Sequence, residues 1–378
     1  MLVKALFQAV NLLLLLIELS QSYLVTSVWC HGSHQDHRHC AFQNLCYSPF
    51  TEQYLFFHSH NESIMSGIDD PNEQIDLVRL SSVIGNKELY LNYVPMPALA
   101  SQDYDTEFVD LPVLLVKRWR PLDAFSMVHD DLLPMYLTLQ YLCHNEVEKC
   151  LQDFVIAFED NHKVELYEKL FPNIMYLRNY KTTFSENQLL CFKKLTVGLE
   201  SESVWYNHGF DTISGPIQNL NFRPFILEDF RKFVLSQLKI GKLKIFKRLL
   251  RSSSDLCFNT VHKTFSNLVK CDQDGFVVVI LEDSTRFENS AEVIEALQQE
   301  KQKWPSSASQ ELKILNLNML STSMPELIAK VSCARILLAF HTPYLMAAIF
   351  LPKLHSGTVV HFLSSIVWKI DPEGGRVT

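Results

Sequence analysis

The chain has 378 residues, of which 47% are hydrophobic and 20% are charged, and its formal net charge is −8. This composition is typical of a globular protein, and the length suffices for two domains that each bury a core. The acidic net charge argues against a nucleic-acid-binding protein. The one basic stretch, residues 239–251, is more typical of the basic face of a surface helix than of a nucleic-acid-binding patch.

The N-terminus predicts entry into the secretory pathway. Lys4 precedes an apolar run that only Gln8 and Asn11 interrupt before Glu18. This pattern is typical of a secretory signal or of a signal-anchor. Small residues at 20–22 offer a cleavage site, whereas extension of the run to residue 28 gives enough length to span a bilayer. The residues leave both alternatives open, a secretory-lumen protein after cleavage or a membrane-anchored one.

Cysteines and a glycosylation sequon agree with an oxidising lumen. Of nine cysteines, Cys30, Cys40 and Cys46 follow the apolar run closely, so we expect one local disulfide and a distant partner for the third. Asn61, in Asn-Glu-Ser, is the predicted N-glycosylation site. The loop between Cys30 and Cys40 holds four histidines, but a zinc site needs a second group of ligands. We therefore predict no metal there.

Further along the chain, strand-like runs occur at residues 54–58, 88–94, 111–116 and 154–159, and a helix is expected at 130–143, between the last two of them. A stretch rich in Gly, Pro and Asn, residues 214–224, looks like a connection, and an amphipathic helix follows it. The last third alternates regularly, with strands expected at 275–282, 311–317, 335–340 and 357–363 and helices between them. Such alternation predicts βαβ units around a parallel sheet.

The predicted fold is therefore α/β, with two Rossmann-like domains. We expect an N-terminal segment at 1–28, a first α/β domain at 29–222 and a second at 223–378. Ligands of open α/β sheets bind at the carboxyl ends of the strands, so those ends are the places to search for a site. The absence of GxGxxG, P-loop and GxSxG motifs argues against NAD, FAD and ATP enzymes and against lipases.

His129, Asp130 and Asp131 stand ahead of an apolar stripe with helical spacing. The two aspartates could simply begin a helix, since acids are common at helix starts. Alternatively, an aspartate could orient His129 as a general base. In the second domain, Arg286 and His341 each follow a predicted strand and could hold a diphosphate. Each of them could equally be an ordinary loop or sheet-edge residue.

Several motifs resemble glycosyltransferase family 61. They include the cysteine-spaced segment at residues 30–48, His-Asp-Asp-Leu-Leu-Pro at 129–134 and Trp-Tyr-Asn-His-Gly-Phe at 205–210, in order over nearly the whole chain. The resemblance implies a GT-B architecture, with two lobes facing a cleft. It implies inverting transfer of N-acetylglucosamine from UDP-GlcNAc to O-linked mannose, or to another O-linked acceptor, on a glycoprotein in the endoplasmic reticulum lumen. It also favours the membrane-anchored alternative for the N-terminal segment.

The same resemblance assigns roles to residues. His129, Asp130 and Asp131 would serve as base and acceptor-binding groups, Arg286 and His341 would bind the donor, and Arg118 would lie at the cleft. The sequence leaves open whether Mn²⁺ assists, because His-Asp-Asp is not the Asp-x-Asp arrangement of metal-dependent transferases. The alternative hypothesis is a catalytically inactive relative with a truncated C-terminal lobe, which binds a glycoprotein or a partner enzyme.

Overall fold

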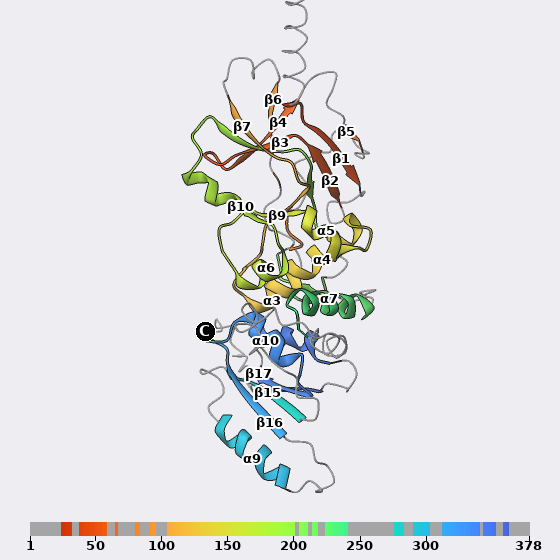
Figure 1. Cartoon of the computed structure of the whole chain (residues 1–378), viewed down its shortest axis with the longest axis vertical. Helices are drawn as coiled ribbons and strands as arrows, with labels where there is room; N and C mark the ends of the chain where they lie inside the picture. The colour runs from red at the N-terminus through yellow and green to blue at the C-terminus, as the bar shows by residue number, and fades with distance from the viewer. Residues whose placement is uncertain are drawn as a thin grey trace, which may run out of the picture. The chain divides into compact units, whose positions relative to one another are not determined.

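The computed structural model describes residues 24–31, 38–58, 65–66, 80–83, 89, 91–95, 104–200, 204–210, 214–217, 224–240, 276–282, 290–302, 312–340, 343–352 and 358–362. The chain divides into two compact units, Met1–Pro224 and Phe225–Thr378 (Figure 1).

The larger sheet of the first unit has seven described strands. They are β1 (Ser27–His31), β2 (His39–Gln43), β5 (Met65–Ser66), β8 (Val113–Val116), β9 (Val155–Phe158), β10 (Ile174–Tyr176) and β12 (Leu195–Val197). Their order is β10-β9-β8-β12-β2-β1-β5. Strands β10, β9, β8 and β12 run parallel to one another, whereas β2 is antiparallel to both β12 and β1. All residues of β8 and β9 are buried, as expected for central parallel strands.

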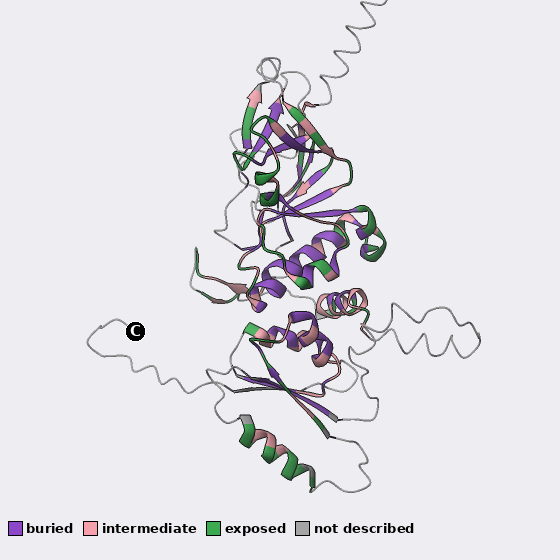
Figure 2. Ribbon diagram, turned by 60° about the vertical axis from the view of Figure 1, so that its left-hand side comes forward, coloured by how far each residue is buried: buried purple, intermediate pink, exposed green. Residues whose placement is uncertain are grey.

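The smaller sheet has five described strands in the order β6-β4-β3-β11-β7. They are β3 (Leu45–Ser48), β4 (Gln53–His58), β6 (Leu91–Pro95), β7 (Asp105–Val109) and β11 (Gln188–Phe192). A short antiparallel ribbon joins β13 (Tyr206–Asn207) to β14 (Gly215–Pro216). One core cluster takes buried side chains from both sheets, including Phe42, Phe56, Leu115 and Phe192. Figure 2 colours the chain by burial, and most of the strands of the first unit contain buried (purple) residues. Removing each such side chain from water stabilises the fold by roughly 1.5–3 kcal/mol.

The helical segment after β8 begins earlier than the sequence predicts. It runs without a break through α3 (Ala124–Ser126), the π-helical turn η4 (Met127–Leu132) and α4 (Leu133–Leu142). Asp123 caps it, because its backbone is extended and its Oδ1 accepts the Ser126 N–H at 2.9 Å. The prediction that Asp130 or Asp131 begins the helix is therefore wrong. Both aspartates lie inside the helical segment and are buried.

Further short helices in the first unit connect the strands. They are α5 (Val147–Cys150), the 3₁₀ turn η5 (Leu151–Asp153), α6 (Glu165–Leu170) and the 3₁₀ helix η6 (Leu177–Thr182). The helical segment from α3 to η5 lies between β8 and β9, and α6 lies between β9 and β10. These three strands with their helices form the predicted βαβ pattern.

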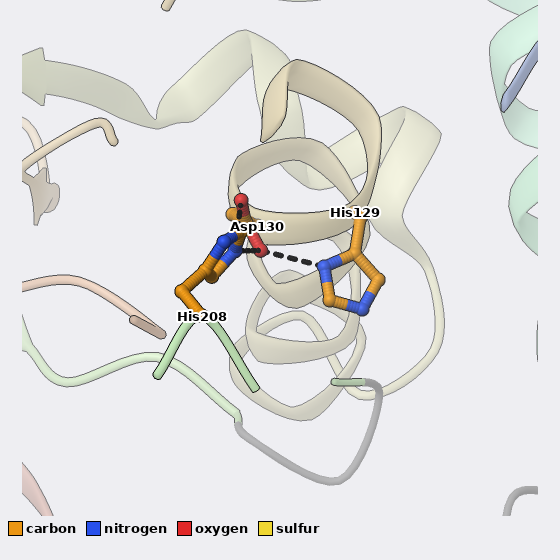
Figure 3. Close-up of side chains that lie close together, drawn as sticks. All are labelled: His129, Asp130 and His208. Carbon is orange, nitrogen blue, oxygen red and sulfur yellow. Dashed lines mark hydrogen bonds and ion pairs between the residues drawn. The ribbon is translucent and has the colours of Figure 1, made fainter. Parts of the chain in front are cut away.

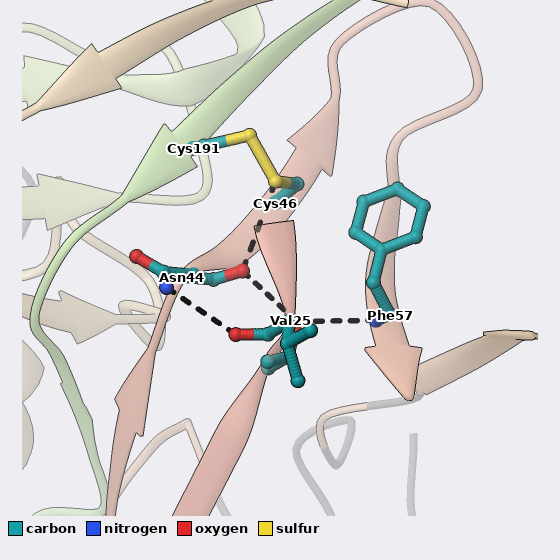
Figure 4. Close-up of a disulfide and its surroundings, with 6 residues drawn as sticks. Val25, Asn44, Cys46, Phe57 and Cys191 are labelled. Atoms are coloured by element: carbon teal, nitrogen blue, oxygen red, sulfur yellow. Dashed lines mark hydrogen bonds between the residues drawn. A yellow bond between two sulfur atoms is a disulfide. The ribbon is translucent and has the colours of Figure 1, made fainter. Parts of the chain in front are cut away.

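Three disulfides are present among the described residues, and they join Cys30 to Cys40, Cys46 to Cys191, and Cys143 to Cys150. The expected local bridge after the N-terminal segment is confirmed, and so is a distant partner for Cys46. The Cys46 bridge links β3 to β11 at residues that face each other in the ladder (Figure 4). Disulfides in these numbers indicate folding in an oxidising compartment.

A tight turn at Asn44 connects β2 to β3 and lies beside this bridge (Figure 4). Asn44 has φ of 55°, a left-handed conformation that asparagine tolerates. Its side-chain amide donates to the Val25 carbonyl at 3.2 Å, and its own carbonyl accepts the Thr26 hydroxyl at 2.9 Å. The Thr26 hydroxyl oxygen in turn accepts the Phe57 N–H at 3.1 Å. The chain just before β1 is thus fixed to the β2–β3 turn and to β4 of the smaller sheet.

The second unit confirms the predicted alternation. It contains α7 (Pro224–Gln237), β15 (Phe276–Glu282), α9 (Ser290–Gln302), β16 (Leu312–Asn318), α10 (Met324–Val331), β17 (Ile336–Phe340), the 3₁₀ helix η8 (Pro343–Phe350) and β18 (Thr358–Phe362). The four strands are parallel, in the order β16-β15-β17-β18. The strand order changes direction between β15 and β17, so their carboxyl ends meet at a switch point of the kind that binds ligands in α/β sheets.

The α/β fold class is confirmed, but the first unit is not a simple Rossmann-like domain. It has a second sheet, and its strands β1 and β2 pair antiparallel, which a Rossmann-like domain does not have. The sequence did not predict these pairings, because nothing in the local sequence indicates them. Residues 27 and 28, assigned by sequence to the N-terminal segment, begin β1, and Val28 is buried in the core. Residues 1–23 lie outside the described residues. Within the described part, no helix has the length and apolar character needed to cross a bilayer.

Candidate functional site

The candidate site lies where β8 ends and the helical segment begins. Arg118, two residues after β8, was expected at a cleft, but its side chain is buried. Its Nε donates to Asp160 Oδ2 at 2.9 Å, and its Nη2 donates to the other oxygen of the same carboxylate. The guanidinium carbon also lies 4.1 Å from the ring centre of Phe158 and 4.7 Å from that of Tyr167. Arg118 therefore holds the ends of β8 and β9 together instead of lining a cleft.

Asp131 has a similar internal role. Its Oδ1 accepts the Trp119 N–H at 3.1 Å and its Oδ2 accepts the Tyr167 hydroxyl at 2.8 Å. Burial raises the pKa of Asp131 well above its ordinary value, against the opposing effect of these two hydrogen bonds. Asp131 is completely buried, so it fixes the loop that carries Trp119 and does not face solvent.

Asp130 connects two histidines from distant parts of the chain (Figure 3). His129 Nδ1 lies 2.5 Å from Asp130 Oδ1, and His208 Nε2 lies 3.0 Å from Oδ1 and 2.9 Å from Oδ2. Burial alone would raise the pKa of Asp130, but the hydrogen bonds with His129 and His208 outweigh it and lower the pKa. Asp130 is therefore a buried carboxylate anion that accepts from both rings.

The backbone determines which nitrogen of His129 carries the proton. His129 Nε2 lies 3.0 Å from the backbone nitrogen of Trp205, which can only donate. Nε2 is consequently the acceptor, and the proton resides on Nδ1, where it is donated to Asp130. Both nitrogens of the fully buried His129 are thus occupied. This arrangement does not favour the predicted role of His129 as general base, and it suits a residue that positions Asp130.

His208 fits the role of base better. Its Nε2 donates to Asp130, so the lone pair is on Nδ1, and no hydrogen bond to Nδ1 is present in the described part of the chain. The His208 side chain is 18% exposed, whereas that of Asp130 is completely buried. A buried carboxylate behind a partly exposed imidazole is the arrangement of a general base with its orienting acid.

A metal ion is the other use that these three side chains suggest. One ligand atom from each of His129, Asp130 and His208 lies within 4.8 Å of the others. Coordination through His129 Nδ1 would require a proton on Nε2, which would then face the Trp205 N–H. Two donors would oppose each other at 3.0 Å, so this group does not fit a metal. The structure gives Mn²⁺ no place at these residues.

Several aromatic rings lie close to His208. The ring centre of Tyr206 lies 5.5 Å from that of His208, and those of Trp119 and Phe125 lie 6.3 Å from it. Phe210 contacts Trp119 edge to face at 5.0 Å and is 44% exposed. His208 is therefore set in an aromatic wall of Trp119, Phe125, Tyr206 and Phe210, and both His208 and Phe210 are partly open to solvent.

Comparison with known proteins identifies relatives. No family model matches the chain. The curated proteins named "Protein O-linked-mannose beta-1,4-N-acetylglucosaminyltransferase 2" match most of it. The Xenopus tropicalis protein is 27% identical over 87% of this chain and 51% of its own length, and that of Takifugu rubripes is 26% identical over 86% and 51%. The Gallus gallus protein is 30% identical over 65% and 41%. The chain is similar to these transferases over most of its length.

The chain spans about half the length of the curated relatives that it matches. The resemblance seen in the sequence is thus confirmed. Of the predicted site residues, the structure brings His129 and Asp130 together and turns Asp131 and Arg118 inward. Arg286, His341 and Asn61 lie outside the described residues, so their predicted roles stay predictions. His208 was missed, although it stands in one of the motifs that carried the resemblance, because its partner is 78 residues away.

Proposed function

We propose that the chain transfers N-acetylglucosamine from UDP-GlcNAc to a mannose O-linked to a glycoprotein of the secretory pathway. The names of the relatives support the reaction class. The observation that carries the proposal is the pairing of Asp130 with His208, because a glycosyl transfer to a hydroxyl needs one base and this pair supplies it.

In the proposed reaction, His208 Nδ1 takes the proton of the acceptor hydroxyl. The Asp130 carboxylate stabilises the imidazolium that forms, since it already accepts the Nε2–H. The acceptor oxygen attacks the anomeric carbon of the donor from the side opposite the diphosphate. The bond to UDP then breaks, so the configuration at that carbon inverts. The proton ends on His208 and the negative charge on UDP.

The aromatic wall suits a sugar acceptor. The carbon-bound hydrogens of a hexose pack well against aromatic faces, and the wall offers the ring of Tyr206 beside His208 and that of Phe210 beside Trp119. We propose that the acceptor mannose is held there with its reactive hydroxyl toward Nδ1. Phe210 is the best probe of this step, because its ring is substantially exposed.

The donor would bind to the second unit, as in a GT-B transferase. Its sheet supports this assignment, because the strand order changes direction between β15 and β17. Arg286 and His341 follow these two strands in sequence and are the proposed donor-binding residues. The three disulfides support a lumenal location, and we propose the endoplasmic reticulum lumen, with the N-terminal segment as membrane anchor.

Two measurements on the full chain test the proposal against the inactive-relative alternative. The first is calorimetric binding of UDP, which we expect Arg286→Ala to abolish. The second is UDP release from UDP-GlcNAc in the presence of an O-mannosyl peptide, which we expect His208→Ala to abolish. A folded chain that neither binds UDP nor releases it would refute the proposal and favour a protein that binds glycoproteins without catalysis.

A further inference from the structure

A buried serine from a distant part of the chain contacts the turn that carries Asp130. Ser82 belongs to the stretch of residues 80–83, all four of which are buried. Its hydroxyl donates to the backbone carbonyl of Asp130 at 2.5 Å, although the two residues are 48 positions apart in sequence. The proposed transfer so far gives Ser82 no role, because the proton chemistry involves only the side chain of Asp130.

The turn that Ser82 contacts departs from α-helical hydrogen bonding. It is the π-helical turn η4, after which the Leu133 N–H donates to the Val128 carbonyl, five residues earlier. In an α-helix, the Asp130 carbonyl would accept the N–H of the residue four positions later. That residue is Pro134, which has no N–H. The Ser82 hydroxyl therefore supplies a donor to a carbonyl for which the α-helical pattern offers none.

The same stretch also holds the end of β8. The Leu80 carbonyl accepts the N–H of Lys117, the residue directly after β8, at 2.8 Å. Residues 80–83 thus connect the end of β8 to the turn η4, the two parts of the chain at which the candidate site lies. The direction of a side chain follows from the conformation of its backbone, so a fixed Asp130 carbonyl also fixes the direction of the Asp130 carboxylate.

We infer that Ser82 is a positioning residue for the proposed transfer. Its hydroxyl holds the backbone of Asp130 so that the carboxylate reaches His129 and His208 at the same time. Without that hydroxyl, a buried carbonyl loses a donor and the turn moves to recover one. A displacement of about 1 Å in a catalytic arrangement can slow a reaction about a hundredfold. The effect on rate rests on the proposed function, whereas the effect on the bonds between Asp130 and the histidines does not.

The experiment compares Ser82→Ala with Ser81→Ala in the full chain. Ser81 is the matched control, because it is also buried and its hydroxyl accepts the Val83 N–H at 3.3 Å within the same stretch. The first readout is the proton NMR resonance of His129 Nδ1–H, which the short hydrogen bond to the Asp130 carboxylate moves downfield and which His129→Gln identifies by its loss. We expect Ser82→Ala to shift this resonance and Ser81→Ala to leave it unchanged.

The second readout is UDP release with an O-mannosyl peptide. We expect Ser82→Ala to lower kcat roughly tenfold to a hundredfold and to change KM little, because Ser82 acts through Asp130 and not on the sugar. A serine that only stabilised the fold would lower the melting temperature without this selective loss of kcat in the folded protein.

The NMR readout separates this inference from the transferase proposal. A resonance that moves in Ser82→Ala and stays in Ser81→Ala supports the positioning role, even if the wild-type chain transfers no sugar. A folded Ser82→Ala chain with the wild-type resonance would overturn the inference, and so would equal shifts in the two variants. If the wild type is active, an unchanged kcat in Ser82→Ala would overturn it too. Should Ser82→Ala not fold, Ser82→Cys makes the same comparison, because it nearly keeps the side-chain volume and offers only a weak S–H donor.

Discussion

Asp130 carries the charge on which the proposed chemistry depends, so Asp130→Asn is the sharpest perturbation. The carboxylate accepts from both His129 and His208, and an amide would present its own N–H groups to at least one of these donors. When His208 takes a proton, its attraction to the carboxylate is worth about 4 kcal/mol for charges about 4 Å apart at an effective dielectric of about 20. Loss of that attraction slows the transfer by about a thousandfold.

The assay is UDP release under saturating UDP-GlcNAc and O-mannosyl peptide, with kcat and KM determined separately. We expect Asp130→Asn to lower kcat about a thousandfold and to change KM little, because the carboxylate acts on the proton and not on the sugar. Asp131→Asn is the matched control. It makes the same chemical change at the next residue, whose buried side chain contacts Trp119 and Tyr167 and not His208.

Comparable losses of kcat in the two variants, with both proteins folded by circular dichroism, would refute the reasoning. That result would mean that the whole turn matters through packing and that the pairing with His208 has no special role. An Asp130→Asn enzyme with nearly full activity would refute the base assignment itself.

Three further results are expected. His208→Ala should lower kcat by about 10²–10⁴-fold, the usual contribution of a general base, with the same thermal melting curve as the wild type. Removing the Cys46–Cys191 bridge, which closes a loop of 145 residues, should lower the free energy of unfolding in urea by about 5 kcal/mol, against about 3 kcal/mol for the local bridge of the β1–β2 hairpin. Because burial raises the pKa of Asp131, its contribution to stability is greatest below the unfolded pKa of about 4 and falls as the pH rises through the folded pKa. Asp131→Asn should therefore become less destabilising, relative to the wild type, as the pH rises above about 4, as measured by urea unfolding at each pH.

The fold was predictable wherever one local pattern determined the structure. The four strands of the second unit were visible as short apolar runs between helical stripes, and their parallel pairing follows from that alternation. The first unit could not be predicted in the same way. Strand β2 pairs with β12, about 155 residues later, and β3 pairs with β11 at a similar distance. Such pairings depend on the tertiary arrangement of strands whose local sequences look alike.

The site shows the same limit at the level of single side chains. Three consecutive helical residues point in different directions, so His129, Asp130 and Asp131 could not all face one ligand. The structure gives each a different partner, Trp205 for His129, His208 for Asp130, and Tyr167 for Asp131. Each partner lies at least 36 residues away, and sequence spacing contains no information about such contacts. The motif indicated the region of the proposed proton chemistry, but only the contacts identify His208, outside these three residues, as the proposed proton acceptor, with Asp130 behind it and His129 and Asp131 holding the surrounding chain in place.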